Sequence, residues 1–350
     1  MSKQFLLAAF IVFLLVAFRS REKPLFVAPP SWPQPHYDFS ENPLTASKIA
    51  LGRVLFYDPL LSADSSTSCS SCHSSYTAFA HTDHALSHGI HDSIGTRNAP
   101  ALMNLAWKKS LMWDGAVHHL DLQALAPIAH PAEMGEELQH LTRKLQSTGM
   151  YNVLFKNAFG DTLVTGERTL KAIAQFMLVL VSAQSKYDSV MQGKTQFTLQ
   201  EKKGYRLYQQ HCSGCHAEPL FTNDEFAYNG LPADPKLNDS GRMKITGDPK
   251  DSLHFKVPTL RNIEVSYPYM HDGRFMNLTA VLKHYSTSAS ALPLNNPKLS
   301  LPLPLTPADR VDLLAFLLTL TDKNFLFNPD FAYPKKIIEQ ATKESERFRK

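Results

Sequence analysis

The stretch "TSCSSCHSSY", from Thr67 to Tyr76, decides how the rest of the chain is interpreted. It contains two cysteines followed directly by a histidine, and the same pattern recurs in "HCSGCHAEPL", from His211 to Leu220. Together the two motifs use all 4 cysteines of the chain. Cys-x-x-Cys-His is the attachment signature of c-type haem, in which both cysteines form thioethers and the histidine ligates the iron. The sequence therefore predicts two covalently bound haem c groups, held by Cys69, Cys72, His73, Cys212, Cys215 and His216.

Two other uses of paired cysteines explain the pattern less well. A thioredoxin-like redox pair belongs in a strand–helix–strand setting, which the sequence does not show, and it gives the histidine no role. A four-cysteine zinc site places its pairs about 15 to 20 residues apart. Here the two pairs are separated by about 140 residues. We therefore expect one iron in each half of the chain.

The length and composition of the chain limit the number of domains and the kinds of partner. The chain has 350 residues, of which 43% are hydrophobic and 19% charged, enough for two ordinary cores. The net charge is +4, without a run of basic residues or a basic stripe interleaved with aromatics. We expect two domains and no nucleic-acid partner.

The N-terminal residues have the features of a targeting segment. An unbroken apolar run from Phe5 to Phe18 follows Lys3, and basic residues come directly after it. This length suits an export signal, and the basic residues also fit an uncleaved membrane anchor, so residues 1–23 are predicted to be one or the other. Either places the remainder in the periplasm. Residues 24–43 contain six prolines and are expected to form an extended tether.

Helical periodicity dominates the rest of the chain, and no convincing alternating strand series is present. An amphipathic helix is expected around Leu138, Leu141 and Leu145, and a buried central helix over residues 170–181, which are apolar on nearly all sides.

The second half shows clear helix starts. Thr198 and Glu201 have capping-box spacing before a helix that leads into the second cysteine motif. Thr306 and Pro307 begin another helix. That helix is expected to align three apolar side chains on one face, namely Val311, Leu314 and Leu318.

Long irregular stretches over residues 221–258 and 286–304 separate the helices and are typical of loops around a functional group. The predicted fold is mainly α. A boundary near residues 184–197 gives an N-terminal haem domain over 44–190 and a C-terminal haem domain over 191–330, followed by a charged tail over 331–350.

The sequence that follows each cysteine motif resembles a known family. The stretches "GTRNAPALMNLAWKKSLMWDGAVHHLDLQALAPIAHPAEMGE" (residues 95–136) and "FKVPTLRNIEVSYPYMHDGRFMNLTAVLKHY" (residues 255–285) resemble the bacterial di-haem cytochrome c peroxidases, including the MauG-type enzymes. The resemblance covers roughly residues 42–322, with both haem motifs in register. It implies two cytochrome-c-like domains. The first haem would react with hydrogen peroxide, and the second would receive electrons from a small cytochrome c or a cupredoxin. The resemblance is also compatible with a homodimer.

The resemblance assigns roles to individual residues. Gln123 and Glu133 match the family's distal pair at the first haem. A carboxylate in a haem pocket can move a proton between the peroxide oxygens, and Gln123 would orient the peroxide and stabilise developing charge. Without the family match, both residues would be interpreted as solvated surface groups. Trp113 takes the position of the inter-haem tryptophan, the expected electron relay, although a core aromatic role is also consistent.

The family also binds calcium between the domains. On this sequence the implied ligands are Asn98 and the backbone carbonyls of Ser266 and Pro268, hard oxygen donors that suit this ion.

Two positions depart from the typical peroxidases. A histidine that caps the resting first haem falls here on Ile90, between His88 and His91, and MauG-type members lack this cap. With His81 and His84 these histidines also suggest a metal site, but a loop of solvated imidazoles is the preferred interpretation. The methionine ligand of the second haem falls on Tyr285, as in MauG-type members, and a phenolate favours ferric iron. Met270, Met276 and His284 are the neighbouring alternatives.

Three functions are consistent with these features: a peroxidase, a MauG-like oxidase that modifies a partner protein, and a non-enzymatic di-haem electron carrier. A carrier needs no distal pair that handles protons, so Gln123 and Glu133 favour an enzyme.

Overall fold

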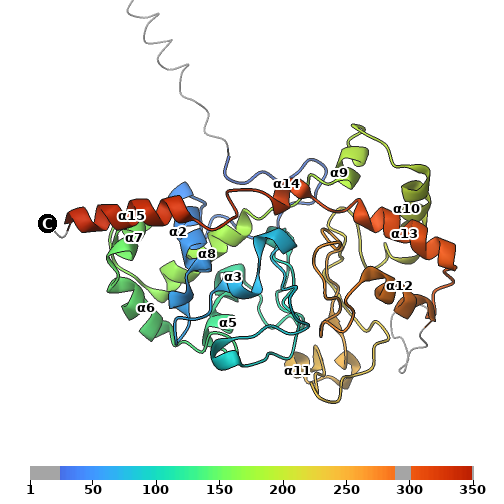
Figure 1. Cartoon of the computed structure of the whole chain (residues 1–350), viewed down its shortest axis with the longest axis horizontal. Helices are drawn as coiled ribbons and strands as arrows, with labels where there is room; N and C mark the ends of the chain where they lie inside the picture. Colours follow the sequence, from blue (N-terminus) through green and yellow to red (C-terminus); the bar gives the residue numbers. More distant parts are fainter. Residues whose placement is uncertain (1–23, 288–300, 349–350) are drawn as a thin grey trace, which may run out of the picture.

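The chain folds into two mainly helical lobes that lie side by side (Figure 1). The computed structural model describes residues 24–287 and 301–348. The apolar run from Phe5 to Phe18 lies outside these ranges, as does most of the predicted loop over residues 286–304. Within the described ranges, no helix is long and apolar enough to cross a membrane.

The elements follow one another in chain order. The N-terminal lobe contains α2 (Ala46–Tyr57), η1 (Pro59–Leu61), α3 (Cys69–Cys72), η2 (Ser75–Thr77), η3 (Ile90–Asp92), η4 (Leu105–Trp107), α4 (Leu120–Gln123), α5 (Leu125–Ala129), α6 (Leu138–Gln146), α7 (Gly149–Phe159) and α8 (Gly166–Leu178). The C-terminal lobe contains α9 (Lys186–Met191), α10 (Leu199–His211), β1 (Phe226–Ala227), α11 (Met243–Thr246), η5 (Pro249–Asp251), β2 (Phe255–Lys256), α12 (Leu278–Thr287) and α13 (Pro307–Leu318). Two last helices, α14 (Lys323–Leu326) and α15 (Lys335–Phe348), end the described chain.

The core of the N-terminal lobe forms where α2 crosses α8. Helix α8 is buried along most of its length, which confirms the predicted central helix. The crossing depends on Gly52, because a Cβ atom at this position would lie 1.8 Å from the carbonyl oxygen of Ala172. The two backbones therefore approach more closely than any larger side chain would allow.

The C-terminal lobe repeats this arrangement with α10 and α13. The predicted capping box from Thr198 to Glu201 is present, and Thr306, the expected cap of α13, forms a second capping box with Asp309. A Cβ atom on Gly204 would lie 1.9 Å from the carbonyl oxygen of Asp312. A glycine thus brings the main helix pair together in each lobe.

The three residues expected to align on one face of α13 are not those that form its main core contact. Leu314 packs half-buried against the core, Val311 and Leu318 are exposed, and the buried side chains are Leu313, Phe316 and Leu317. Because α13 is apolar on several sides, its periodicity alone does not select the face that packs on α10.

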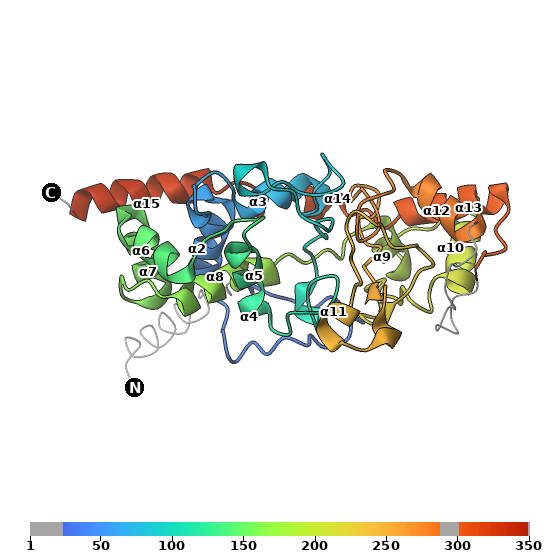
Figure 2. The same cartoon turned by 90° about the horizontal axis from the view of Figure 1, so that it is seen from below.

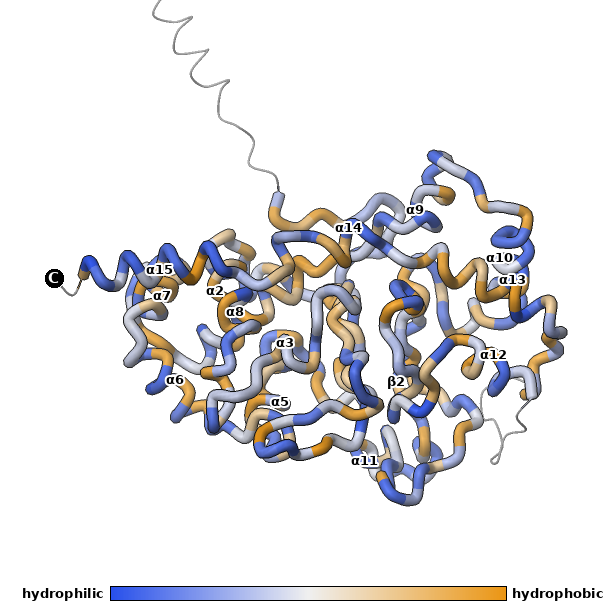
Figure 3. The backbone as a smooth tube through the Cα atoms, viewed as in Figure 1, coloured by the Kyte–Doolittle hydropathy of each residue, from blue (hydrophilic) through white to orange (hydrophobic). Residues whose placement is uncertain are grey.

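Irregular loops fill the region where the lobes meet (Figure 2). Figure 3 shows that these loops mix hydrophilic and hydrophobic residues, whereas α8 and α13 are mostly hydrophobic. Residues 221–258 contain a short antiparallel ladder, in which Phe226 is paired with Lys256 and Ala227 with Phe255.

Both ends of the described chain pack on the lobes. Residues 331–350, expected as a charged tail, include α15, which packs on α7 through a face that contains the buried Ala341. The proline-rich residues 24–43 are extended and lie against the N-terminal lobe. There the Trp107 indole donates a hydrogen bond to the Pro33 carbonyl oxygen at 2.7 Å, and Trp32 packs edge-on against Trp107.

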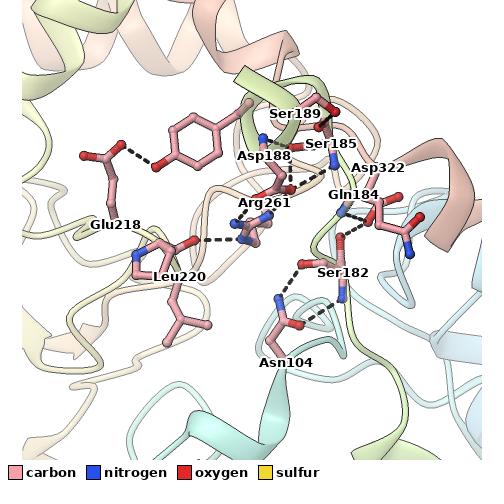
Figure 4. Close-up of polar contacts among 12 residues, drawn as sticks. Asn104, Ser182, Gln184, Ser185, Asp188, Ser189, Glu218, Leu220, Arg261 and Asp322 are labelled. Atoms are coloured by element: carbon pink, nitrogen blue, oxygen red, sulfur yellow. Dashed lines mark hydrogen bonds and ion pairs between the residues drawn. The ribbon is translucent and has the colours of Figure 1, made fainter. Parts of the chain in front are cut away.

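A polar network connects the two lobes along the linker after α8 (Figure 4). Asp322 accepts hydrogen bonds from the Ser182 hydroxyl at 3.1 Å and from the Gln184 backbone N–H at 2.8 Å. The fully buried Arg261 forms a two-pronged ion pair with Asp188 at 2.8 and 2.9 Å. On the N-terminal side, the Ser182 backbone N–H donates to the Asn104 side-chain oxygen at 2.9 Å, so both lobes hold the linker by buried polar contacts.

Candidate functional site: two haem-attachment motifs and the groups around them

The first cysteine motif forms a single helical turn. Ser68 caps α3, and its capping box with Ser71 fixes the start of the turn. Cys69 and Cys72 therefore lie on one short helix, with His73 as the residue that ends it. All four cysteines lie in the described part of the chain, and none of them forms a disulfide there. Burial raises the pKa of the Cys69 thiol to about 12 and also raises that of Cys72.

The ring of His73 is oriented by a backbone hydrogen bond. Its Nδ1 lies 2.6 Å from the carbonyl oxygen of Phe79. Because a carbonyl only accepts, Nδ1 must carry the proton, and Nε2 keeps its lone pair. Burial lowers the pKa of His73 to about 4, so the ring is neutral at pH 7. A neutral imidazole whose other nitrogen is fixed by a hydrogen bond is the form that ligates a metal.

The second motif has the same chemistry. Cys212 is the residue that ends α10, and Cys215 and His216 follow in the turn. The Nδ1 atom of His216 lies 3.0 Å from the carbonyl oxygen of Pro258, and burial lowers the pKa of this histidine to about 4. Both histidines therefore present a bare Nε2, and both motifs fit a covalently attached haem.

Gln123 is the last residue of α4, and only the nitrogen of its side-chain amide has a hydrogen-bond partner in the protein. The Nε2 group donates to the Met112 sulfur at 3.0 Å. The Oε1 atom is buried and has no hydrogen-bond partner in the protein. A buried amide oxygen without a partner is costly, so this atom fits a site that a ligand completes.

Glu133 lies in the turn after α5, and the loop of histidines contacts this turn. The backbone N–H of Ile90 donates to the Glu133 carbonyl oxygen at 2.8 Å. Burial raises the pKa of the Glu133 carboxyl, while His130, with Nδ1 at 3.8 Å, opposes the rise. The carboxylate raises the pKa of both thiols of the first motif, which places it near that motif. Its side chain keeps 43% of its surface exposed, so a proton can be exchanged with solvent.

Trp113 lies at the contact between the lobes. Its indole N–H donates to the Asn98 carbonyl oxygen at 2.8 Å. Its own carbonyl oxygen accepts from the Lys256 backbone N–H at 2.7 Å, across to the C-terminal lobe. The tryptophan therefore contacts both lobes.

The predicted calcium ligands come from segments that contact each other. The Asn98 backbone N–H donates to the His271 carbonyl oxygen at 2.7 Å, which holds Asn98 beside the loop that contains Ser266 and Pro268. The Asn98 amide nitrogen donates to the Ala85 carbonyl oxygen at 3.0 Å. The side-chain oxygen of Asn98 is then the atom that could coordinate a cation.

Tyr285 lies near the second motif. Burial raises the pKa of its phenol to about 12, and Cys212 and Cys215 add to the rise because both thiols are close. The neighbouring alternatives are used elsewhere. His284 Nε2 lies 3.1 Å from the Asn229 carbonyl oxygen, the Met270 sulfur accepts from the Asn229 amide at 3.3 Å, and Met276 is exposed.

The histidine-rich loop does not converge on one point. The rings of His84 and His88 lie 4.9 Å apart, and His88 Nδ1 contacts Asp92 at 2.5 Å. His91 is exposed beside Asp64. Among the described residues no group of three or more His, Cys, Asp or Glu side chains is arranged to hold a metal ion.

The structure adds functional candidates that the sequence did not single out. Met112 anchors Gln123, and Lys108 and Lys256 are buried between the lobes. The only sequence signal for Met112 was its position directly before Trp113. No sequence signal indicated that Lys108 and Lys256 are buried.

The fold and the two motifs define a di-haem c-type cytochrome. Residues 46–196 match the family model described as "Di-haem cytochrome c peroxidase", and residues 201–321 match the cytochrome c model. The protein belongs to the di-haem cytochrome c peroxidase family, which includes MauG, and its cofactors are two haem c groups.

Named relatives fall on both branches of this family. The chain is 35% identical to the methylamine utilization protein MauG of Methylorubrum extorquens, over 87% of this chain and 85% of that protein. It is also 35% identical to the cytochrome c551 peroxidase of Nitrosomonas europaea, over 84% of each. Among solved structures, a MauG-like protein associated with microbial copper homeostasis matches with a TM-score of 0.79 and 31% identity, covering 89% of this chain and 99% of that one.

Proposed function

We propose that this protein is a peroxidase that reduces hydrogen peroxide to water with electrons from a small cytochrome c or cupredoxin. The observation that carries the proposal is the state of the two expected distal residues: a buried Gln123 oxygen without a partner in the protein, and a Glu133 carboxyl with a raised pKa that lies near the first motif. An electron carrier has no use for such a pair. The haem iron supplies the redox chemistry when it is bound.

The protein groups supply orientation and proton transfer. His73 offers Nε2 as the proximal ligand because Phe79 holds Nδ1. With its amide nitrogen on Met112, Gln123 presents an acceptor that can take a hydrogen bond from a peroxide hydroxyl. The Glu133 carboxylate takes the proton from one peroxide oxygen and returns it to the other, which leaves as water.

The remaining roles extend across the molecule. Trp113 would relay electrons between the lobes, and Tyr285 would be the sixth ligand of the second haem. Asn98, Ser266 and Pro268 would hold a calcium ion at the contact between the lobes. The proposal leaves the first haem without a histidine cap, as in MauG-type members; the contacts of His88 with Asp92 and of His91 with Asp64 support it.

Steady-state peroxide turnover with a reduced donor cytochrome tests the proposal. Glu133→Gln should lower turnover by about 10² to 10⁴ while both haems stay attached, since general acid–base help of this size is lost. The matched control is Glu137→Gln, an exposed carboxylate that should leave turnover unchanged. Near-normal turnover of Glu133→Gln would remove this residue from the mechanism.

A second candidate is a MauG-like oxidase that modifies a partner protein. The proximity of Tyr285 to the second motif favours it, as does the likeness to MauG and to the MauG-like protein associated with copper homeostasis. Mass spectrometry of co-purified or genetically neighbouring proteins after peroxide treatment separates the two: covalent oxidation of a partner at a rate above donor turnover supports the oxidase.

We also propose export to the periplasm through residues 1–23. Fractionation of cells should recover the haem protein outside the cytoplasm, and the mass of the mature chain distinguishes a cleaved signal from a retained anchor. Recovery of the haem-loaded protein in the cytoplasm would contradict the proposal.

A further inference from the structure

Two buried lysines from different lobes share one carboxylate between the haem motifs. Lys108 follows η4 in the N-terminal lobe, and Lys256 belongs to β2 in the C-terminal lobe. Their side chains are only 12% and 9% exposed. Each ammonium lies near Asp224 Oδ1, at 3.3 Å from Lys108 and 3.5 Å from Lys256.

This carboxylate does not satisfy both lysines. Tight ammonium–carboxylate hydrogen bonds measure about 2.7 to 2.9 Å, and both contacts to Asp224 are longer. The other oxygen of Asp224 is occupied by the Lys109 backbone N–H at 2.7 Å. The remaining contacts of Lys256 are with neutral groups, the Ser110 hydroxyl and the Phe226 ring at 4.7 Å.

The cluster therefore holds an excess positive charge in a buried place. Two ammonium groups face one carboxylate, and burial lowers the pKa of both lysines, that of Lys256 to about 8. A buried charge without a counter-charge is strongly unfavourable. One further anion would neutralise the cluster.

The position of the cluster indicates which anion this is. Asn223, the residue before Asp224, donates its backbone N–H to the Cys215 carbonyl oxygen at 2.8 Å, so the carboxylate that both lysines share lies beside the second motif. The Lys256 backbone N–H contacts the Trp113 carbonyl oxygen. The cluster thus lies between the second haem motif and the relay tryptophan. The anionic groups that haem c itself brings to this region are its two propionate carboxylates.

We propose that Lys108 and Lys256 bind a propionate carboxylate of the second haem, one ammonium from each lobe. The proposal rests on the second haem being present and not on which reaction the protein catalyses. The bound carboxylate would make the cluster neutral. Since the two lysines come from different lobes, the same contact would hold the haem against both of them beside Trp113.

The test uses the haem-loaded protein and the variants Lys108→Met and Lys256→Met. Spectroelectrochemical titration gives the midpoint potential of each haem, and resonance Raman spectra report the propionate bending mode. Loss of a nearby positive charge favours ferric iron, so the second haem should shift to lower potential, with its propionate mode displaced. Lys109→Met is the matched control because Lys109 is the exposed neighbour, and both readouts should stay at their wild-type values.

Lys256→Arg keeps the charge and should stay near the wild-type potential, which covers the case in which Lys256→Met does not fold. A lowered potential with an unchanged propionate mode would mean that the lysines act only as distant charges, and the proposal would fail. Unchanged potentials in both Met variants would also overturn it. A wild-type potential that responds to added acetate, with saturation, would show that the cluster takes a free carboxylate instead.

Discussion

The contact between the Gln123 amide nitrogen and the Met112 sulfur leaves the Oε1 atom of Gln123 as the one without a partner in the protein. Met112→Leu keeps the volume and removes the acceptor, so the amide should rotate freely. We expect kcat/KM for peroxide to fall several-fold with both haems retained. The control is Met191→Leu, at an exposed methionine. Equal kinetics for Met112→Leu and the wild type would show that the thioether does not position Gln123.

The raised pKa of Glu133 makes a prediction about acid pH. The carboxylate is the active form, so kcat/KM should fall as the pH drops through a pKa above the ordinary value of 4.5. Burial causes the rise, and His130 partly opposes it. A pH–rate profile checks this, and Glu133→Gln should lose the same acid limb. An acid limb that persists in the variant would belong to another group.

Among the individual site residues, those that attach the haems could be predicted, because two thioethers to one haem need a fixed local spacing of the two cysteines. Gln123 and Glu133 could be predicted only through the family resemblance, since an isolated amide or carboxylate usually lies at the surface. The burial of Lys108 and Lys256 could not be predicted. It arises from the contact between lobes, and lysine is almost never fully buried without a partner.

The helix pair of each lobe depends on one glycine at its crossing. Gly204→Ala would place a Cβ atom 1.9 Å from the Asp312 carbonyl oxygen, so α10 and α13 must move apart. We expect a loss of about 1–3 kcal/mol in the free energy of unfolding, the usual cost of overpacking. Denaturant titration of the holoprotein measures it.

Gly95→Ala is the control, because its added Cβ would meet only ordinary contacts at 3.8 Å. A stable Gly204→Ala variant would mean that the crossing tolerates a wider separation than its geometry indicates.

Helix positions and caps could be predicted well from the sequence, because capping boxes and apolar periods are local signals. The face of α13 could not be, because Val311 and Leu318 are as apolar as Leu313 and Leu317. Only the position of α10 decides which of these residues is covered. The packing of α15 on α7 could not be predicted either, because charged residues dominate the sequence of α15.

At the scale of the whole molecule, Arg97 connects the lobes through two carboxylates. It contacts Asp114 at 2.6 Å in its own lobe and Asp239 at 2.5 and 2.9 Å in the other. Arg97→Met leaves both carboxylates buried without this partner. We expect a loss of about 3 kcal/mol or more in the free energy of unfolding, and thermal unfolding that separates into two transitions. Arg143→Met, at an exposed arginine, should leave the curve unchanged.

The effect of Arg97→Met should depend on pH. Burial disfavours the charged form of Asp239, yet hydrogen bonds from Arg97 and the Gly241 N–H outweigh it and hold its pKa well below 3.8. The stabilisation is therefore complete above the ordinary pKa and is lost as the pH falls through the lowered one. Wild type and variant should converge in strong acid. A difference that is constant down to that range would argue against the ion pair as its source.

The central claim is that one haem is open to peroxide while the other is closed by Tyr285. The electron paramagnetic resonance spectrum of the fully oxidised holoprotein tests it most directly, because an open ferric haem with a single histidine ligand is high-spin. We predict a high-spin ferric signal from the haem at His73 together with a second signal from the haem at His216 that Tyr285→Phe alters. A spectrum of purely low-spin iron at His73 would contradict the account, because it would mean that a side chain occupies the peroxide site.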